Sequence, residues 1–194
     1  HRGDKEPYAV LPFPKHYRIG SVYSMIVFGL DIYDFEYAYR VDGVHDPEKG
    51  LIFDKTKPLL DPYARAVTGQ SVWGEQPNQD HDYHARVVVN DFDWGDHADP
   101  MKPIEDLIIY ELHVRGFTKD LSSGVSHPGT FDGIREKIPY LKDLGITAVE
   151  LMPVFEFDET MGRREVIGRT LLDYWGYNTV GFFAPNTGYT ARQE

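Results

Sequence analysis

The stretch Leu-Ile-Ile-Tyr-Glu-Leu-His-Val at residues 107–114 decides the fold class, because it is almost continuously apolar. Such a run predicts a β-strand that is covered on both faces, as in a parallel sheet. A second run of this kind, Ile-Thr-Ala-Val-Glu-Leu-Met, occupies residues 146–152. Between the two, apolar residues recur every three or four positions from Phe131 to Leu144, which predicts one apolar face of a helix. Strand, helix and strand in this order predict a right-handed βαβ unit.

Three residues define the limits of the expected helix. Thr130 is a helix-capping residue type and stands directly before the apolar pattern. Gly145 follows the last apolar position, where a glycine commonly ends a helix. Pro139 falls inside the pattern, so we expect it to kink the helix or to delay its start.

The chain upstream of this unit follows a different pattern. Short runs of alternating apolar and polar residues are bounded by Gly, Pro and Asp, which predicts a β-rich segment. The expected strands lie at residues 22–28, 35–41 and 86–89. We therefore divide the chain into residues 1–99, a partial β-sandwich with a linker, and residues 100–194, an α/β segment.

Composition restricts the functions that the chain can have. Its net charge of −11 repels phosphate backbones, which makes nucleic acid an improbable partner. No run approaches the roughly 20 apolar residues of a membrane span. Cysteine is absent, which is compatible with a cytoplasmic protein. The chain has 194 residues, begins with His1 and ends at Glu194 without a terminating element, so we expect a piece of a larger protein.

Several segments resemble the α-amylase superfamily, glycoside hydrolase family 13. Residues 106–118 resemble the first strand of its (β/α)8 TIM barrel, and residues 140–154 resemble its first helix and second strand. Tyr-Trp-Gly-Tyr-Asn at residues 174–178 resembles the segment that follows. Residues 37–43 and 59–65 are similar to isoamylases and glycogen-debranching enzymes, at the end of their family 48 carbohydrate-binding module. The resemblance implies a β-sandwich remnant followed by the first two strands and first helix of a barrel.

The resemblance also implies a reaction. It points to retaining hydrolysis of α-1,6 branch points in glycogen, amylopectin or limit dextrin, which requires two carboxyl groups and no organic cofactor. The family carries its catalytic carboxylates on the fourth, fifth and seventh barrel strands, and we find no match to those motifs. We therefore assign no catalytic residue and no metal ligand, and we expect the isolated chain to be inactive. Two alternatives remain: a non-catalytic glucan-binding module, and a relative that acts on α-1,4 bonds or transfers branches.

Three residues are candidates for substrate binding. Tyr177 resembles the aromatic residue that the family places against the sugar at the cleavage point, and the alternative is a core tyrosine. Trp175 is a candidate for sugar contact or for packing. Asn178 either binds sugar or stabilises a turn through its own backbone.

Charged residues near the two strands are expected to have structural roles. Glu111, His113 and Glu150 lie inside strands that should be buried, so we expect them to form a network with Arg115.

The remaining polar segments are expected to be loops. Residues 156–159 contain Glu156, Asp158 and Glu159, and a solvated acidic loop is favoured over a cleft lining. Residues 161–170 form a charged, arginine-rich excursion at the surface. His81 and His84, together with Asp80 and Asp82, are expected in a polar loop rather than at a metal.

Overall fold

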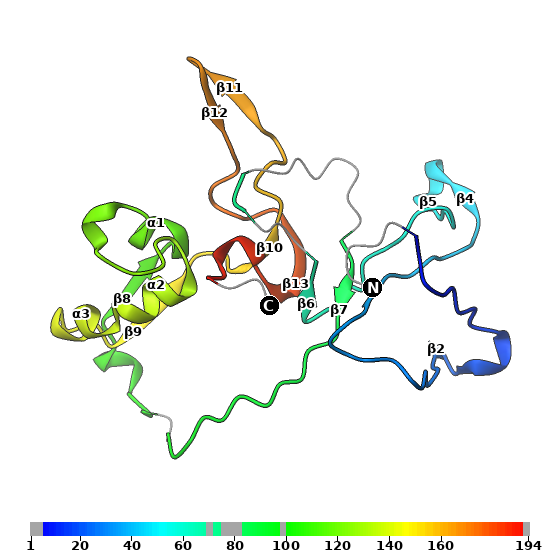
Figure 1. Cartoon of the computed structure of the whole chain (residues 1–194), viewed down its shortest axis with the longest axis horizontal. Helices are drawn as coiled ribbons and strands as arrows, with labels where there is room; N and C mark the ends of the chain where they lie inside the picture. The colour runs from blue at the N-terminus through cyan, green and yellow to red at the C-terminus, as the bar shows by residue number, and fades with distance from the viewer. Residues whose placement is uncertain (1–5, 69–71, 75–82, 98–99, 192–194) are drawn as a thin grey trace.

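The computed structural model describes residues 6–68, 72–74, 83–97 and 100–191. It contains an α/β part, small antiparallel sheets and long connecting segments (Figure 1). Within the described residues, no helix is both long and apolar enough to cross a membrane.

The predicted βαβ unit is present. Strand β8 (Ile109–Leu112) pairs in parallel with β9 (Ala148–Leu151), and Ile109 lies opposite Ala148. The short helix α1 (Val114–Thr118) follows β8 directly. Figure 1 shows the helices α1, α2 and α3 grouped around this pair of strands.

Pro139 divides the expected helix into two. Helix α2 (Phe131–Glu136) is capped by Lys137. Helix α3 (Ile138–Asp143) then begins with the proline in its first turn, where the missing N–H costs no hydrogen bond. The hydroxyl of Thr130 accepts from the Gly133 N–H at 3.2 Å, which confirms the cap. Gly145 has φ +86°, a left-handed conformation that glycine adopts without strain.

Only one face of this parallel sheet is covered. Leu112 is buried, but Ile109, whose side chain points to the opposite face of the strand, is more than half exposed. The expectation of strands covered on both faces is therefore wrong for the described residues, because only two strands are paired and no second layer packs on their open face.

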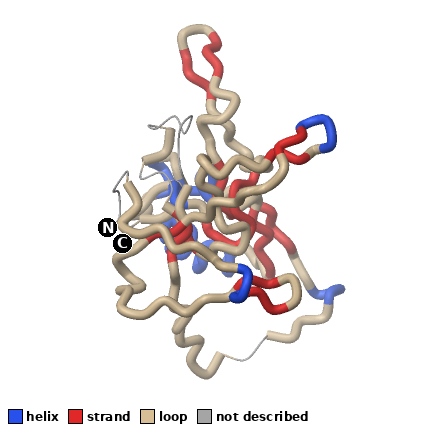
Figure 2. Tube along the Cα trace, turned by 90° about the vertical axis from the view of Figure 1, so that its right-hand side faces the viewer, coloured by secondary structure: helices blue, strands red, loops and turns tan. Residues whose placement is uncertain are grey.

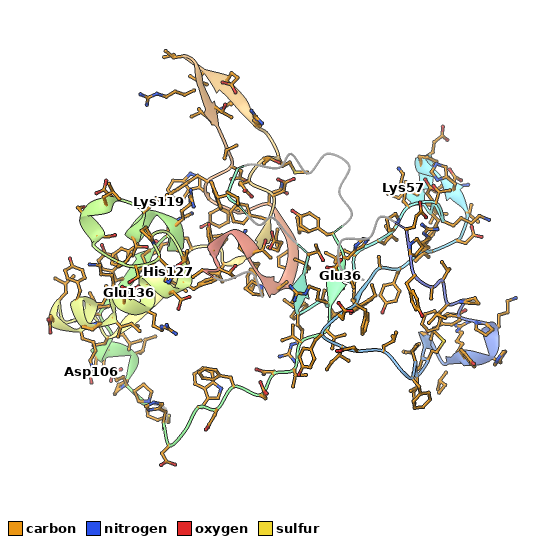
Figure 3. All side chains as sticks on the ribbon, in the orientation of Figure 1. Glu36, Lys57, Asp106, Lys119, His127 and Glu136 are labelled. Atoms are coloured by element: carbon orange, nitrogen blue, oxygen red, sulfur yellow. The ribbon has the colours of Figure 1, made fainter. Side chains whose placement is uncertain are left out.

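Figure 3 places Lys119, His127 and Glu136 together in the helical part and Glu36 well away from them, near β7.

The upstream segment forms shorter strands than the sequence predicts. The strand expected at residues 22–28 is reduced to β2 (Val22–Tyr23), which pairs with β1 (Arg18–Ile19). The other short strands of this segment are β3 (Glu36–Tyr37), β4 (His45–Asp46), β5 (Leu51–Ile52), β6 (Ala66–Val67) and β7 (Ala85–Arg86).

The largest sheet in the described residues has the order β3–β7–β6, and β4 pairs with β5. The strands expected at residues 35–41 and 86–89 are each reduced to two residues, and Tyr39 adds one isolated bridge to Leu59. Short 3-10 helices lie at Lys15–Tyr17, Pro47–Lys49, Ile104–Asp106, Leu121–Ser123 and Thr187–Tyr189.

The segment after β9 joins the two parts of the chain. Strand β10 (Phe155–Phe157) pairs with β13 (Thr179–Pro185). Ala184 of β13 packs in one apolar cluster with four upstream residues, Ala64, Val67, Tyr83 and Ala85. The proposed division at residue 99 stays a prediction, and this cluster crosses it.

The chain exposes far more surface than a compact protein of its size. Its accessible surface is 14994 Å² for a mass of 22.3 kDa. A compact monomer of that mass exposes about 9,400 Å². The open path of the chain in Figure 2 agrees with this excess.

Candidate functional site

His113 holds the segment at residues 174–178 in place. Its Nδ1 accepts a hydrogen bond from the Gly116 N–H at 3.0 Å, so Nε2 carries the proton and donates to the Tyr174 carbonyl at 2.7 Å. The two rings stack with centroids 4.0 Å apart. Burial lowers the pKa of His113, partly opposed by the bond to Tyr174. A neutral imidazole of defined tautomer therefore fixes the start of this segment.

Gly176 allows the segment to pass close to the core. It has φ +78°, and a Cβ at this position would lie 2.6 Å from the Phe157 ring. The residues on either side of it point outward. Trp175 is 53% exposed and Tyr177 is 72% exposed, so neither is a core residue.

Tyr177 lines a hollow of about 430 Å³, which we call the Tyr177 hollow. Its other walls include Glu111 of β8, Glu150 of β9, Phe155 of β10 and Phe182 of β13. Aromatic rings offer the apolar C–H face of a sugar a flat surface, and carboxylates accept hydrogen bonds from its hydroxyls. The Tyr177 hollow has the chemistry of a carbohydrate site.

The two strand glutamates are exposed, which corrects the expectation of a buried network with Arg115. Glu111 and Glu150 are directly paired in the parallel register, so their side chains share one face of the sheet. Two like charges on neighbouring strands repel each other. Arg115 does not join them: it belongs to helix α1, which follows β8, and its guanidinium lies over the Trp73 ring.

Trp175 and Asn178 lie outside the Tyr177 hollow. Trp175 packs edge-on against Tyr174, with ring centroids 5.2 Å apart. The side-chain amide of Asn178 donates to the sulfur of Met161 rather than to its own backbone. Binding of sugar by Tyr177, Trp175 and Asn178 stays a prediction.

Trp73 was not identified from the sequence, yet it supports the site. Its ring stacks on Tyr189 with centroids 5.6 Å apart and meets Phe157 edge-on at 5.7 Å. The Arg115 guanidinium lies 4.6 Å from the centroid of the same ring. Tyr189 in turn meets His113 edge-on. A tryptophan from the upstream segment is thus built into the cluster that holds residues 174–178.

A buried acidic group lies beneath the cluster, where a solvated loop was expected. Glu156, Asp158 and Glu159 are all buried, so that expectation is wrong. Burial raises the pKa of Glu156 to about 7, opposed by the hydrogen bond from the Thr187 N–H at 2.7 Å. Burial also raises the pKa of Glu159, whose carboxylate accepts from the Gly74 N–H. Backbone donors from distant segments, which the sequence does not reveal, make this burial possible.

The described residues contain no group of three or more His, Asp or Glu side chains that could hold a metal ion. His84 lies 3.5 Å from a Glu36 carboxylate oxygen, across the β3–β7 pair. His81, Asp80 and Asp82 lie outside the described residues.

Comparison with known proteins gives consistent similarities. Residues 75–182, more than half of the chain, match the model of the alpha amylase catalytic domain. The chain is 38% identical to isoamylase 1, chloroplastic, of Arabidopsis thaliana over 92% of this chain and 24% of that protein. It is 35% identical to the glycogen operon protein GlgX homolog of Mycobacterium tuberculosis, over 81% of this chain and 24% of that protein.

A solved structure shares the fold. Pullulanase type I from Bacillus subtilis str. 168, complexed with maltose, aligns with a TM-score of 0.52 and 28% identity, over 73% of this chain and 20% of that one. The chain spans about a quarter of the length of the curated relatives that it matches.

Proposed function

Because this chain belongs to the α-amylase family, we propose that it is the substrate-binding start of an α-glucan debranching hydrolase. The substrates are the α-1,6 branch points of glycogen or a related glucan. The relatives named isoamylase and glycogen operon protein support this choice, as does the pullulanase structure with maltose.

The observation that carries the proposal is the Tyr177 hollow. An exposed aromatic ring stands at the carboxyl-terminal side of two parallel strands, and barrel enzymes bind substrate on that side. The Tyr177 ring stacks on a glucosyl unit, and the Glu111 and Glu150 carboxylates accept hydrogen bonds from its hydroxyls. His113 and Gly176 fix the segment, so Tyr177 is held in position before the ligand arrives.

Hydrolysis requires more than this chain supplies. A retaining mechanism places one carboxylate as nucleophile and a second as general acid, roughly 5–5.5 Å apart, on the ends of different barrel strands. Glu111 and Glu150 lie within β8 and β9 rather than beyond them, so we assign neither a catalytic role. We therefore propose that the 194-residue chain binds α-glucan and does not cleave it.

Two measurements test the proposal. The purified chain should sediment with insoluble amylopectin and stay in solution with an equal mass of cellulose, because the hollow is proposed to accept α-glucan. The same preparation should release no reducing ends from amylopectin. Release that is lost in Glu111→Gln would instead assign catalysis to the strand glutamates, and absence of sedimentation would contradict glucan binding.

A non-catalytic binding module is the second candidate function. It is favoured by the exposed aromatic rings of Tyr177 and Phe182 in the Tyr177 hollow. The two proposals differ in the larger protein: debranching activity in the gene product that contains these residues supports the hydrolase, and binding alone supports the module.

A further inference from the structure

The chain between Thr160 and Leu172 forms a hairpin that projects from the rest of the molecule (Figure 1). Strand β11 (Arg164–Val166) pairs with β12 (Arg169–Leu171), with Arg164 opposite Leu171 and Val166 opposite Arg169. Cross-strand partners share a face. One face of the hairpin therefore carries two arginines and two apolar residues, and the other face carries Glu165 and Thr170.

The base of this hairpin bounds a second hollow of about 280 Å³, which we call the hairpin hollow. Its walls include Arg164, Leu171, Asp173, Tyr174 and Trp175. None of these residues lines the Tyr177 hollow. The two hollows nevertheless have lining residues that are close in sequence, because only Gly176 separates Trp175 of the hairpin hollow from Tyr177.

The walls of the hairpin hollow provide a donor, an acceptor and an aromatic face. Among the described residues, no carboxylate forms an ion pair with Arg164, so its guanidinium is available to donate hydrogen bonds. Asp173 supplies acceptor oxygens and disfavours an anionic ligand by repulsion. The half-exposed indole of Trp175 offers a stacking surface. This combination suits a neutral, hydroxyl-rich ligand.

We propose that the hairpin hollow is a second glucan subsite, which holds the arm of a branched α-glucan that the Tyr177 hollow does not hold. Arg164 then determines specificity, since it binds only when the substrate has a second arm. This inference rests on the proposed function, because it takes Tyr177 to bind the first arm. A linear chain fills one hollow and gains nothing from Arg164.

Binding of matched oligosaccharides to the chain tests this proposal. Branched 6-O-α-maltosyl-maltotriose and linear maltopentaose contain the same number of glucosyl units, and their dissociation constants are measurable by tryptophan fluorescence or calorimetry. Arg164→Ala should weaken binding of the branched sugar about tenfold, because a hydrogen bond to a charged donor is lost. Binding of the linear sugar should not change.

Arg169→Ala is the matched control, because Arg169 has the same charge and lies on the same hairpin face, but it does not line the hollow. It should bind both sugars as the unmodified chain does. Trp175→Ala, which removes the stacking surface, should repeat the selective loss.

Three outcomes would overturn the inference. Arg164→Ala could leave branched binding unchanged, or it could weaken both sugars equally, which would indicate a non-selective contact. Binding of neither sugar by the unmodified chain would reject the proposed function together with the subsite. In the first two outcomes the unmodified chain still binds both sugars, so they reject the subsite and leave the proposed function standing.

Discussion

Replacement of Trp73 by alanine should weaken the fold more than replacement of any exposed tryptophan. The indole ring lies against Tyr189 and Phe157, both fully buried, and under the Arg115 guanidinium. Truncation of a buried tryptophan to alanine costs about 3–5 kcal/mol, and a cation–π contact adds about 0.5–2 kcal/mol. Because Trp73 is only partly buried, we expect a loss near the lower limit, about 3 kcal/mol.

Urea unfolding followed by circular dichroism measures this loss. With a slope of about 2 kcal/mol per molar urea, the midpoint should fall by about 1.5 M. Trp94→Ala is the matched control, because Trp94 is 73% exposed and its ring meets the exposed Phe92 ring edge-on. Its loss should stay within about 0.5 kcal/mol. Equal midpoints for the Trp73 and Trp94 variants would refute the role of Trp73 in the cluster.

The segment from Glu156 to Gly176 contains three further positions where a substitution should change stability. Burial raises the pKa of Glu156 to about 7, above its unfolded value, so the folded state binds a proton more tightly and loses stability as pH rises from about 4.5 to 7. Glu156→Gln should therefore gain about 3 kcal/mol over the unmodified chain at pH 8 and little at pH 4, in urea unfolding at both values. An equal effect at both values would contradict it. Gly176→Ala should cost more than 2 kcal/mol in the same assay, because its Cβ meets the Phe157 ring and φ is +78°; an unchanged midpoint would show that the segment does not need glycine. Ile167 has φ +49° at the hairpin tip, which is a strained conformation for a β-branched residue. Ile167→Asn should therefore raise the free energy of unfolding by about 1 kcal/mol and so raise the urea midpoint. A lower midpoint would show that this backbone is unstrained.

Local sequence signals predicted the helical part of the fold well. The apolar period, the Thr130 cap, Pro139 and Gly145 located α2, α3 and the two parallel strands, since each acts over a few residues. The upstream strands were predicted too long, because strand length depends on partners that are distant in sequence.

The candidate site was predicted only in part. Tyr177 was identified by its motif, and its exposure agrees with a binding role. Trp73 and the buried Glu156 and Glu159 were not anticipated, because their environment comes from contacts between segments far apart in the chain. No pattern around Trp73 distinguishes it from a surface tryptophan.

The most direct test of glucan binding at Tyr177 is electrophoresis of the chain in native gels with and without glycogen. Tyr177→Ala removes the exposed ring and should leave the fold intact, since Tyr177 is mostly exposed. The account predicts that glycogen slows the unmodified chain and that Tyr177→Ala migrates nearly as it does without glycogen. Equal retardation of both proteins, or retardation of neither, would contradict it.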